Sequence, residues 1–133
     1  MIMDRELIRF STFNARGLSE NSKRRLVMNW LRKYSNGIIF LQETHSVKVS
    51  EQLWRNDWKG QIEFCHGSSS ARGVAILVPL SIDLTIKEVI RDNTGRFLLL
   101  DTTFENQSLI IINVYAPNKD KTKRLLKFLT TAT

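Results

Sequence analysis

The chain of 133 residues contains a single cysteine, Cys65, and no apolar run that approaches the roughly 18 residues of a membrane-spanning helix. One thiol cannot form an internal disulfide, which is typical of intracellular proteins, so we expect a nuclear or cytoplasmic location and no membrane partner. The first ten residues include Asp4, Arg5, Glu6 and Arg9, and they are therefore not expected to be a signal peptide.

Internal repeats and linkers are also missing from the sequence. The one biased stretch, Gly67–Gly73, is too short for a linker, and it lacks the Gly-Lys-Ser/Thr ending of a phosphate-binding loop. With 42% hydrophobic and 25% charged residues, the composition lies in the ordinary globular range. We therefore expect a single domain over residues 1–133, large enough to bury a core without a disulfide or a metal.

Acidic residues are in the minority. Twenty Lys and Arg against 13 Asp and Glu leave a net charge of +7, a balance that favours a polyanionic partner such as DNA without identifying it. The candidate DNA-binding side chains lie in a predicted helix and in the segment after Asn118: Lys23, Arg24, Arg25, Lys119 and Lys121. Residues 23–25 have a second interpretation, as the solvated face of a helix.

Hydrophobic periodicity predicts a βαβ unit at the start of the chain. The strand Leu7–Phe13 is followed by a turn, by an amphipathic helix over Ser22–Tyr34, and by the buried strand Ile38–Leu41. The two strands should be parallel neighbours with a right-handed crossover. Asn21 or Ser22 is the expected helix cap.

The rest of the sequence is predicted to form mostly strands. A short helix over Val49–Trp58 precedes strands at residues 61–66, 73–79, 84–91, 97–104 and 108–115, whose short polar connections suit hairpins. A second basic amphipathic segment covers residues 121–130. The fold class is therefore α/β, a mixed β-sheet with flanking helices. The aromatic pairs at helical spacing are expected in the core: Trp30 with Tyr34, and Trp54 with Trp58.

Polar residues follow several of the apolar strands directly. Asn14 and Glu43 come at the ends of the two parallel strands, where α/β proteins bind ligands, and their oxygens suit a magnesium ion. Alternatively they only end the strands and bind loop backbone. Tyr115 and Asn118 follow the last strand, and they either hold a phosphate oxygen or form a simple turn before a helix.

Four segments in order resemble one known family. They are Thr12–Leu18 (TFNARGL), Leu41–His45 (LQETH), Gly73–Val78 (GVAILV) and Asn113–Asn118 (NVYAPN). Together they are similar to the endonuclease/exonuclease/phosphatase superfamily, and most of all to the apurinic-type endonuclease domain of LINE-like (non-LTR) retrotransposons. The resemblance runs from about Ile8 to at least Asn118.

The resemblance implies a role for each matching residue. Glu43 corresponds to the metal-binding glutamate, and Asn14 to the asparagine beside the metal and the scissile phosphate. Tyr115 and Asn118 correspond to the pair that contacts the phosphate and positions the attacking water. Arg16 stands where the apurinic-repair enzymes tend to have an aspartate, so it is expected to contact phosphate. The implied ion is Mg²⁺, with Mn²⁺ as an alternative, and the implied substrate is a DNA phosphodiester.

The later motifs of the family, Gly-Asp-Phe-Asn and Ser-Asp-His, have no counterpart before Thr133. The chain thus resembles the N-terminal half of the nuclease, and we expect it to be inactive alone. Two alternatives stay open: a non-catalytic DNA-binding or self-associating module, and half of a phosphatase acting on inositol phosphates or lipids.

The family fold implies a partner. It is a four-layered α/β-sandwich of two sheets with helices outside, and we expect each half of the domain to supply most of one sheet. The chain would then leave one apolar sheet face uncovered. Either a second copy, giving a homodimer, or the missing C-terminal half should cover it.

Overall fold

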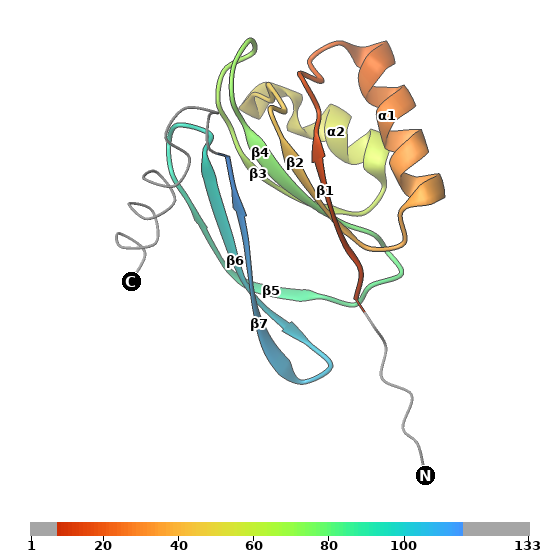
Figure 1. Cartoon of the computed structure of the whole chain (residues 1–133), viewed down its shortest axis with the longest axis vertical. Helices are drawn as coiled ribbons and strands as arrows, with labels where there is room; N and C mark the ends of the chain where they lie inside the picture. Colours follow the sequence, from red (N-terminus) through yellow and green to blue (C-terminus); the bar gives the residue numbers. More distant parts are fainter. Residues whose placement is uncertain (1–7, 116–133) are drawn as a thin grey trace.

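The computed structural model describes residues 8–115, which form two β-sheets with two helices on one side (Figure 1). The first sheet has the strand order β1 (Phe10–Asn14), β2 (Ile38–Gln42), β4 (Val74–Val78), β3 (Gln61–Cys65). β1 and β2 are parallel, and the other pairs are antiparallel. The predicted parallel βαβ unit is therefore confirmed.

The second sheet is an antiparallel meander of β5 (Thr85–Arg91), β6 (Phe97–Phe104) and β7 (Gln107–Val114), and both predicted hairpins are confirmed. The helices are α1 (Asn21–Tyr34) and α2 (Glu51–Trp58), the latter preceded by the 3₁₀ turn η1 (Lys48–Ser50). Within residues 8–115 neither helix is long and apolar enough to cross a membrane. The segment 121–130 and the candidates Asn118, Lys119 and Lys121 lie outside the described residues.

The first sheet is buried on both faces along β2 and β4, whose successive side chains point to opposite faces. One face packs against the helices, where Ile39, Leu41 and Leu77 join Trp54 and Trp58 in one cluster. The core position expected for these two tryptophans is thus confirmed. The other face packs against the second sheet in a separate cluster: Ile38, Val74, Ile76, Val78, Leu98, Leu100 and Ile111.

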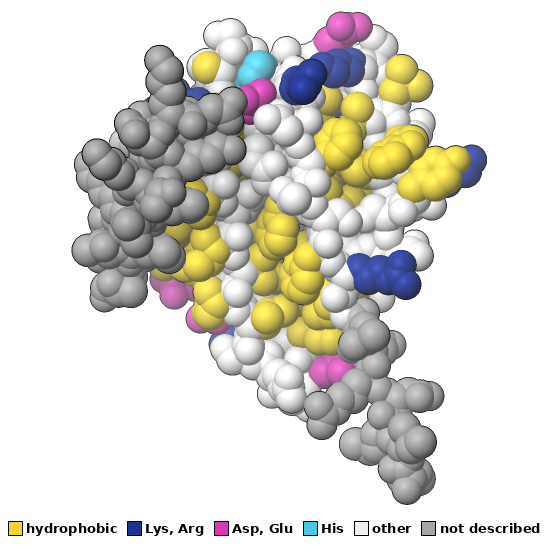
Figure 2. Space-filling model, viewed as in Figure 1, with side chains coloured by type: hydrophobic (Ala, Val, Ile, Leu, Met, Phe, Trp, Pro, Cys, Tyr) yellow, Lys and Arg dark blue, Asp and Glu magenta, His cyan; other side chains and the backbone are white. Residues whose placement is uncertain are grey.

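The expectation that this chain supplies most of one sheet and leaves its face uncovered is wrong. The chain itself makes both sheets, and they bury each other's apolar side chains. The open apolar surface is of another kind: every residue of β1 is exposed, and so are Ile110 and Ile112 of β7. Hydrophobic side chains gather on the face toward the viewer in Figure 2.

The buried stripe of α1 also differs from the prediction. Arg24, Met28 and Leu31 face inward, whereas Trp30 and Tyr34 are 52% and 63% exposed, so their expected place in the core is wrong. Neither Asn21 nor Ser22 caps the helix, because Asn21 is already helical and its Oδ1 accepts a bond from Arg24 Nη2 at 2.8 Å. The buried stripe of α1 therefore includes an arginine that the apolar spacing did not predict.

Candidate functional site

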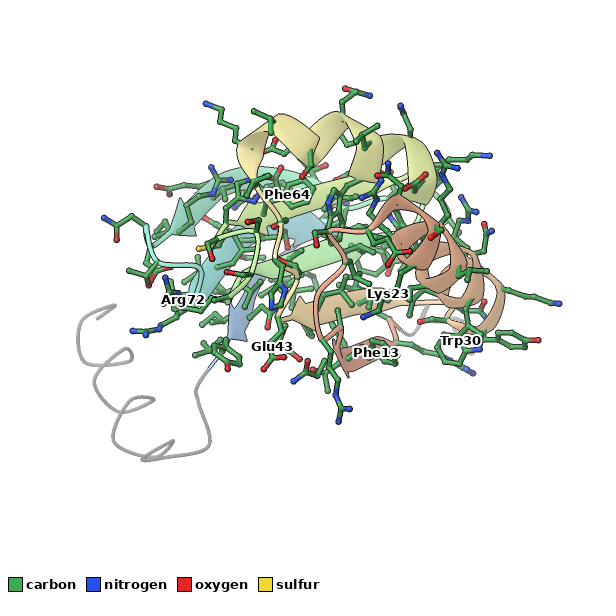
Figure 3. All side chains as sticks on the ribbon, turned by 90° about the horizontal axis from the view of Figure 1, so that it is seen from above. Phe13, Lys23, Trp30, Glu43, Phe64 and Arg72 are labelled. Carbon is green, nitrogen blue, oxygen red and sulfur yellow. The ribbon has the colours of Figure 1, made fainter. Side chains whose placement is uncertain are left out.

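The candidate site lies where strands of both sheets end. Asn14 is the last residue of β1 and pairs in register with Gln42, so it lies beside the strand end that leads into Glu43. Tyr115 directly follows β7, and its hydroxyl donates a hydrogen bond of 3.2 Å to Glu43 Oε1. The structure thus brings Asn14, Glu43 and Tyr115 to one edge. In Figure 3, Glu43 lies between Arg72 on one side and Phe13 and Lys23 on the other.

A buried amide fixes the two sheets to each other beneath this edge. Asn113 Nδ2 donates to the carbonyls of Leu41 (3.0 Å) and Ala75 (2.9 Å), and its Oδ1 accepts from Gln42 Nε2 (2.9 Å). All three bonds cross from β7 to the first sheet, and Asn113 is almost completely buried. Asn113 thus fixes β7 to the first sheet two residues before Tyr115. Its role was not predicted, and the one available signal was a lone Asn in an apolar strand.

Glu43 occupies a strained position in a tightly bonded loop. Its φ of 52° is left-handed, a conformation that costs a non-glycine residue about 1–2 kcal/mol. The backbone around it is held on both sides: Gly17 N donates to Glu43 O (2.7 Å), and Thr44 N donates to Gly73 O (3.1 Å). Strain of this kind persists only when the surroundings hold it, and such strain tends to cluster at functional sites.

The glycines on either side of the loop are required by close contacts. Gly17 and Gly73 both have positive φ, 87° and 96°. A Cβ at Gly17 would lie 2.5 Å from His45 Nδ1, and a Cβ at Gly73 would lie 2.2 Å from Thr44 Oγ1. Any side chain at either position would displace the loop that carries Glu43.

Asn14 and Arg16 form a turn at the open side of the site. Asn14 Oδ1 accepts a hydrogen bond of 3.0 Å from Arg16 N, and Arg16 is exposed. Lys23 Nζ donates to Arg16 O at 3.2 Å, so this lysine of α1 lies over the same turn. Two of the predicted phosphate-contacting cations, Arg16 and Lys23, are therefore near Asn14.

The other two predicted cations of α1 point elsewhere. Arg24 is 1% exposed, and its Nε donates to Asp57 Oδ2 of α2 at 2.8 Å. Because its guanidinium is inside the protein, the prediction that it contacts DNA is wrong. Arg25 is exposed but lies 3.8 Å from Asp57 Oδ1 and lines a cavity of about 190 Å³ between the helices. Arg72 was missed by the sequence analysis: it donates to Thr94 O at 2.8 Å and lies on the other side of Glu43 from Lys23.

The side-chain oxygens at this edge are of the type that a hard cation such as Mg²⁺ prefers, but only two residues provide them. Glu43 provides a carboxylate and Asn14 an amide oxygen, and Mg²⁺ commonly takes one or two protein carboxylates with water and phosphate completing its shell. No group of three or more His, Cys, Asp or Glu side chains that could hold a metal occurs among residues 8–115. The donor set fits an ion whose remaining ligands come from elsewhere.

The clearest pKa shifts lie at another junction of the two sheets. Burial, and then the neighbouring Asp92, raise the pKa of the Cys65 thiol to about 11. Sγ donates to Asp92 Oδ1 at 2.9 Å. Burial alone would raise the pKa of Asp92, but this bond and those from Thr94, Arg96 and Phe97 together lower it. Cys65 is thus a protonated thiol that donates a hydrogen bond to Asp92.

Comparison with known proteins shows the family of the chain that carries this site. Residues 11–128 match the sequence profile of the Endonuclease/Exonuclease/phosphatase family. The chain belongs to this family. A curated relative, the Transposon TX1 uncharacterized 149 kDa protein of Xenopus laevis, is 31% identical over 107 residues, which are 80% of this chain and 8% of that protein. The predicted resemblance to the family and to a LINE-like transposon protein is confirmed.

Solved structures share the fold at low sequence identity. A humanized TDP2 of D. rerio has a TM-score of 0.61 at 18% identity over 91% of this chain. An AP endonuclease from Archaeoglobus fulgidus has a TM-score of 0.59 at 21% identity over 93%. The D. rerio TDP2 complexed with a single-strand DNA product has a TM-score of 0.58 at 20% identity over 90%. The chain spans about half of each of these structures, namely 52%, 49% and 51%. Nucleases of the endonuclease/exonuclease/phosphatase family generally depend on a divalent metal.

Proposed function

We propose that the chain supplies half of the catalytic groups of a Mg²⁺-dependent DNA endonuclease of the retrotransposon type, with Mn²⁺ as an alternative ion. The observation that carries this proposal is the hydrogen bond between Tyr115 and Glu43, which joins the ends of strands from both sheets at one edge. The family match and the transposon relative support the reaction class, and a TDP2 solved with a DNA product supports the substrate class.

Each residue has a proposed part. Glu43 and Asn14 would hold the ion, which supplies charge neutralisation at the phosphate. Arg16 and the Tyr115 hydroxyl orient the phosphodiester for in-line attack by water, and the backbone hydrogen bonds of the Glu43 loop keep these groups aligned. Asn118 is assigned to phosphate contact by resemblance alone and lies outside the described residues.

The isolated chain should not nick DNA. Loss of one transition-state donor typically costs about 100- to 1000-fold in rate, and several donors implied by the family have no counterpart in this sequence. Supercoiled plasmid incubated with the purified chain and Mg²⁺ should stay intact. Nicking by the native chain that a Glu43→Ala variant, purified identically, does not show would disprove inactivity and identify Glu43 as essential.

Metal binding can be tested without catalysis. Mn²⁺ titrated into the ¹⁵N-labelled chain should broaden the amide NMR signals of residues around Glu43, because a paramagnetic ion acts only on nearby nuclei. Glu43→Gln should abolish that broadening. Glu105→Gln is the matched control, since Glu105 is an exposed carboxylate in the turn at the other end of β7. Equal broadening in Glu43→Gln and the native chain would disprove the metal role.

DNA binding is proposed to be non-specific and dependent on salt. Each neutralised phosphate adds about 0.9 to the slope of log affinity against log salt on duplex DNA. Charge reversal at Lys23 should flatten the slope by roughly 1. Reversal at Lys87 of β5, whose Nζ lies 3.5 Å from Asp101 Oδ1, should not. Binding without nicking by any longer form of the chain would favour the non-catalytic module instead.

The partner of the β1 edge is proposed to be polypeptide, either a second copy or a C-terminal half of the domain. Among the described strands β1 pairs only with β2, so its other edge is unpaired. The unpaired edge of a strand is a ready template for another strand. Light scattering of the chain at micromolar concentration tests the first occupant. A species of twice 15.4 kDa supports the homodimer, and a stable monomer leaves the C-terminal half as the proposed partner.

A further inference from the structure

A line of side-chain hydrogen bonds runs behind Glu43 and belongs to no role assigned above. Thr44 Oγ1 lies 2.9 Å from Ser46 Oγ, Ser46 Oγ lies 2.8 Å from His66 Nδ1, and His66 Nε2 lies 2.6 Å from Glu51 Oε2. Thr44 and Ser46 are buried, whereas His66 and Glu51 are partly exposed. The line therefore links the loop of Glu43 to the residue after β3 and to the first turn of α2.

The donors along this line can be ordered. A carboxylate only accepts hydrogen bonds, so the Nε2–H of His66 is the donor and Glu51 Oε2 the acceptor. In the neutral ring, Nδ1 then accepts the hydroxyl proton of Ser46, and Ser46 Oγ accepts that of Thr44. Thr44 Oγ1 also accepts the backbone N–H of Ser46 at 3.3 Å. Both buried hydroxyls are thereby used fully, which is the arrangement that makes a buried polar network stable.

The far end of the line is anchored in the core, whereas the near end lies in a strained loop. The His66 ring stacks on Phe64, with centroids 5.0 Å apart, and Glu51 pairs with Arg55 at 3.5 Å. Phe64 belongs to the core cluster on the helix side. At the near end, Glu43 and His45 both have left-handed φ values, 52° and 53°. Because two residues of the loop are in this unfavourable conformation, the side-chain bonds add to the backbone bonds that hold it.

We propose that His66 is a positioning residue for Glu43. Through Ser46 and Thr44 it holds the loop Glu43–Ser46 in its strained form, so that the Glu43 carboxylate stays at the Tyr115 hydroxyl. The proposal rests on the proposed function in one respect only, the metal-binding role of Glu43.

The competing explanation is that His66 merely ties α2 down through Glu51. Two substitutions separate the two arms of the ring. In His66→Asn the amide oxygen takes the place of Nδ1 and keeps the acceptor for Ser46, but the bond to Glu51 is lost. In His66→Gln the amide nitrogen takes the place of Nε2 and keeps the donor to Glu51, but the bond to Ser46 is lost. Ser46→Ala is a second variant that breaks only the near arm.

The experiment measures amide hydrogen exchange by NMR in the full 133-residue chain. Thr44 N and His45 N donate to Gly73 O (3.1 Å) and Arg72 O (2.9 Å), so their exchange reports opening of the loop. We expect both amides to exchange at least about tenfold faster in His66→Gln and Ser46→Ala, and at near the native rate in His66→Asn. The Mn²⁺ concentration that broadens the site signals should rise about 10- to 100-fold in the first two variants, the usual effect of losing a residue that supports a ligand.

Two results would overturn the proposal. One is native exchange at Thr44 and His45 in both His66→Gln and Ser46→Ala. The other is faster exchange in His66→Asn with native exchange in His66→Gln, which would assign His66 to α2. Glu43→Gln keeps the two failures apart: if Mn²⁺ broadening survives in that variant, the metal role of Glu43 is wrong, and the exchange data still decide the role of His66.

Discussion

The two buried faces of the first sheet are held by different polar groups. On the helix side the buried Arg24 pairs with the partly buried Asp57, and its guanidinium lies 5.8 Å from the Trp54 ring centroid. On the side of the second sheet the buried group is a neutral amide, Asn113, with three hydrogen bonds. The pair joins two helices, whereas the amide joins two sheets directly beneath Glu43. We therefore expect the first to matter for stability and the second for stability and the site together.

The largest expected effect is on the helix side. Arg24→Ala should lower the free energy of unfolding by about 3 kcal/mol, because it removes a buried guanidinium and leaves Asp57 only the distant, exposed Arg25 as a partner. Urea denaturation measures it. Arg25→Ala is the matched control: this neighbour is two-thirds exposed near the same Asp57, and its loss should change stability by no more than about 0.5 kcal/mol. Equal effects would mean that the charged pair does not hold the helices.

The second effect tests the amide between the sheets. Asn113→Leu keeps the volume but leaves two carbonyls and the Gln42 amide without their partner, so we expect a loss of about 2 kcal/mol. The same variant should weaken Mn²⁺ broadening at the site, which Arg24→Ala should not do. A stability loss without any change in broadening would place Asn113 in the same class as Arg24, and the contrast between the two faces would fail.

The third prediction concerns Glu43, which follows β2 at the end of the first sheet. Glu43→Gly should raise the free energy of unfolding by about 1 kcal/mol, since relief of the left-handed conformation outweighs the lost bond to Tyr115. Lys59→Gly is the control, because Lys59 has a similar φ of 62° at the end of α2, far from any candidate ligand. Thermal unfolding of both variants gives the answer. A loss of stability in Glu43→Gly alone would mean that the carboxylate itself stabilises the loop.

The last predicted effect should appear only at high pH. The Cys65 thiol has its pKa raised to about 11, against an ordinary value of 9.0 in the unfolded chain. Its contribution to stability is therefore complete below pH 9 and is lost as pH rises from 9 to 11, where the unfolded state releases the proton first. Urea midpoints of the native chain and Cys65→Ala should converge over this interval. Parallel curves would show that burial of the thiol does not affect its proton.

Much of the fold follows from local patterns. The alternation of apolar residues and the polar turns between them predict the βαβ unit and both hairpins, because these features depend on neighbours in sequence. The number of sheets does not follow, because β4 and β6 are apolar on successive residues and either face is a candidate for burial. Only the packing of Leu98 and Leu100 on Ile76 and Val78 decides it.

The candidate site could be predicted in part for a similar reason. Asn14 and Glu43 were expected together, since parallel strands end at one edge. The family resemblance placed Tyr115 at the phosphate, but its bond to Glu43 was not predicted, because 72 residues separate the two in sequence. The burial of Arg24 could not be foreseen, because its partner Asp57 is 33 residues away and the helix pattern treats every basic residue as solvent-facing. Asn113 was missed for the same reason: its three acceptors and donors are all distant in sequence.

The three tryptophans give the molecule an optical asymmetry. Trp54 and Trp58 are buried on the helix side, where the indole N–H of Trp58 donates to Val78 O at 3.1 Å, whereas Trp30 is half exposed beside Phe13 of β1 and Tyr34. Acrylamide should therefore quench one indole readily and two hardly at all. A blue shift confined to the quenchable fraction would report, without any label, that another molecule has covered the β1 edge.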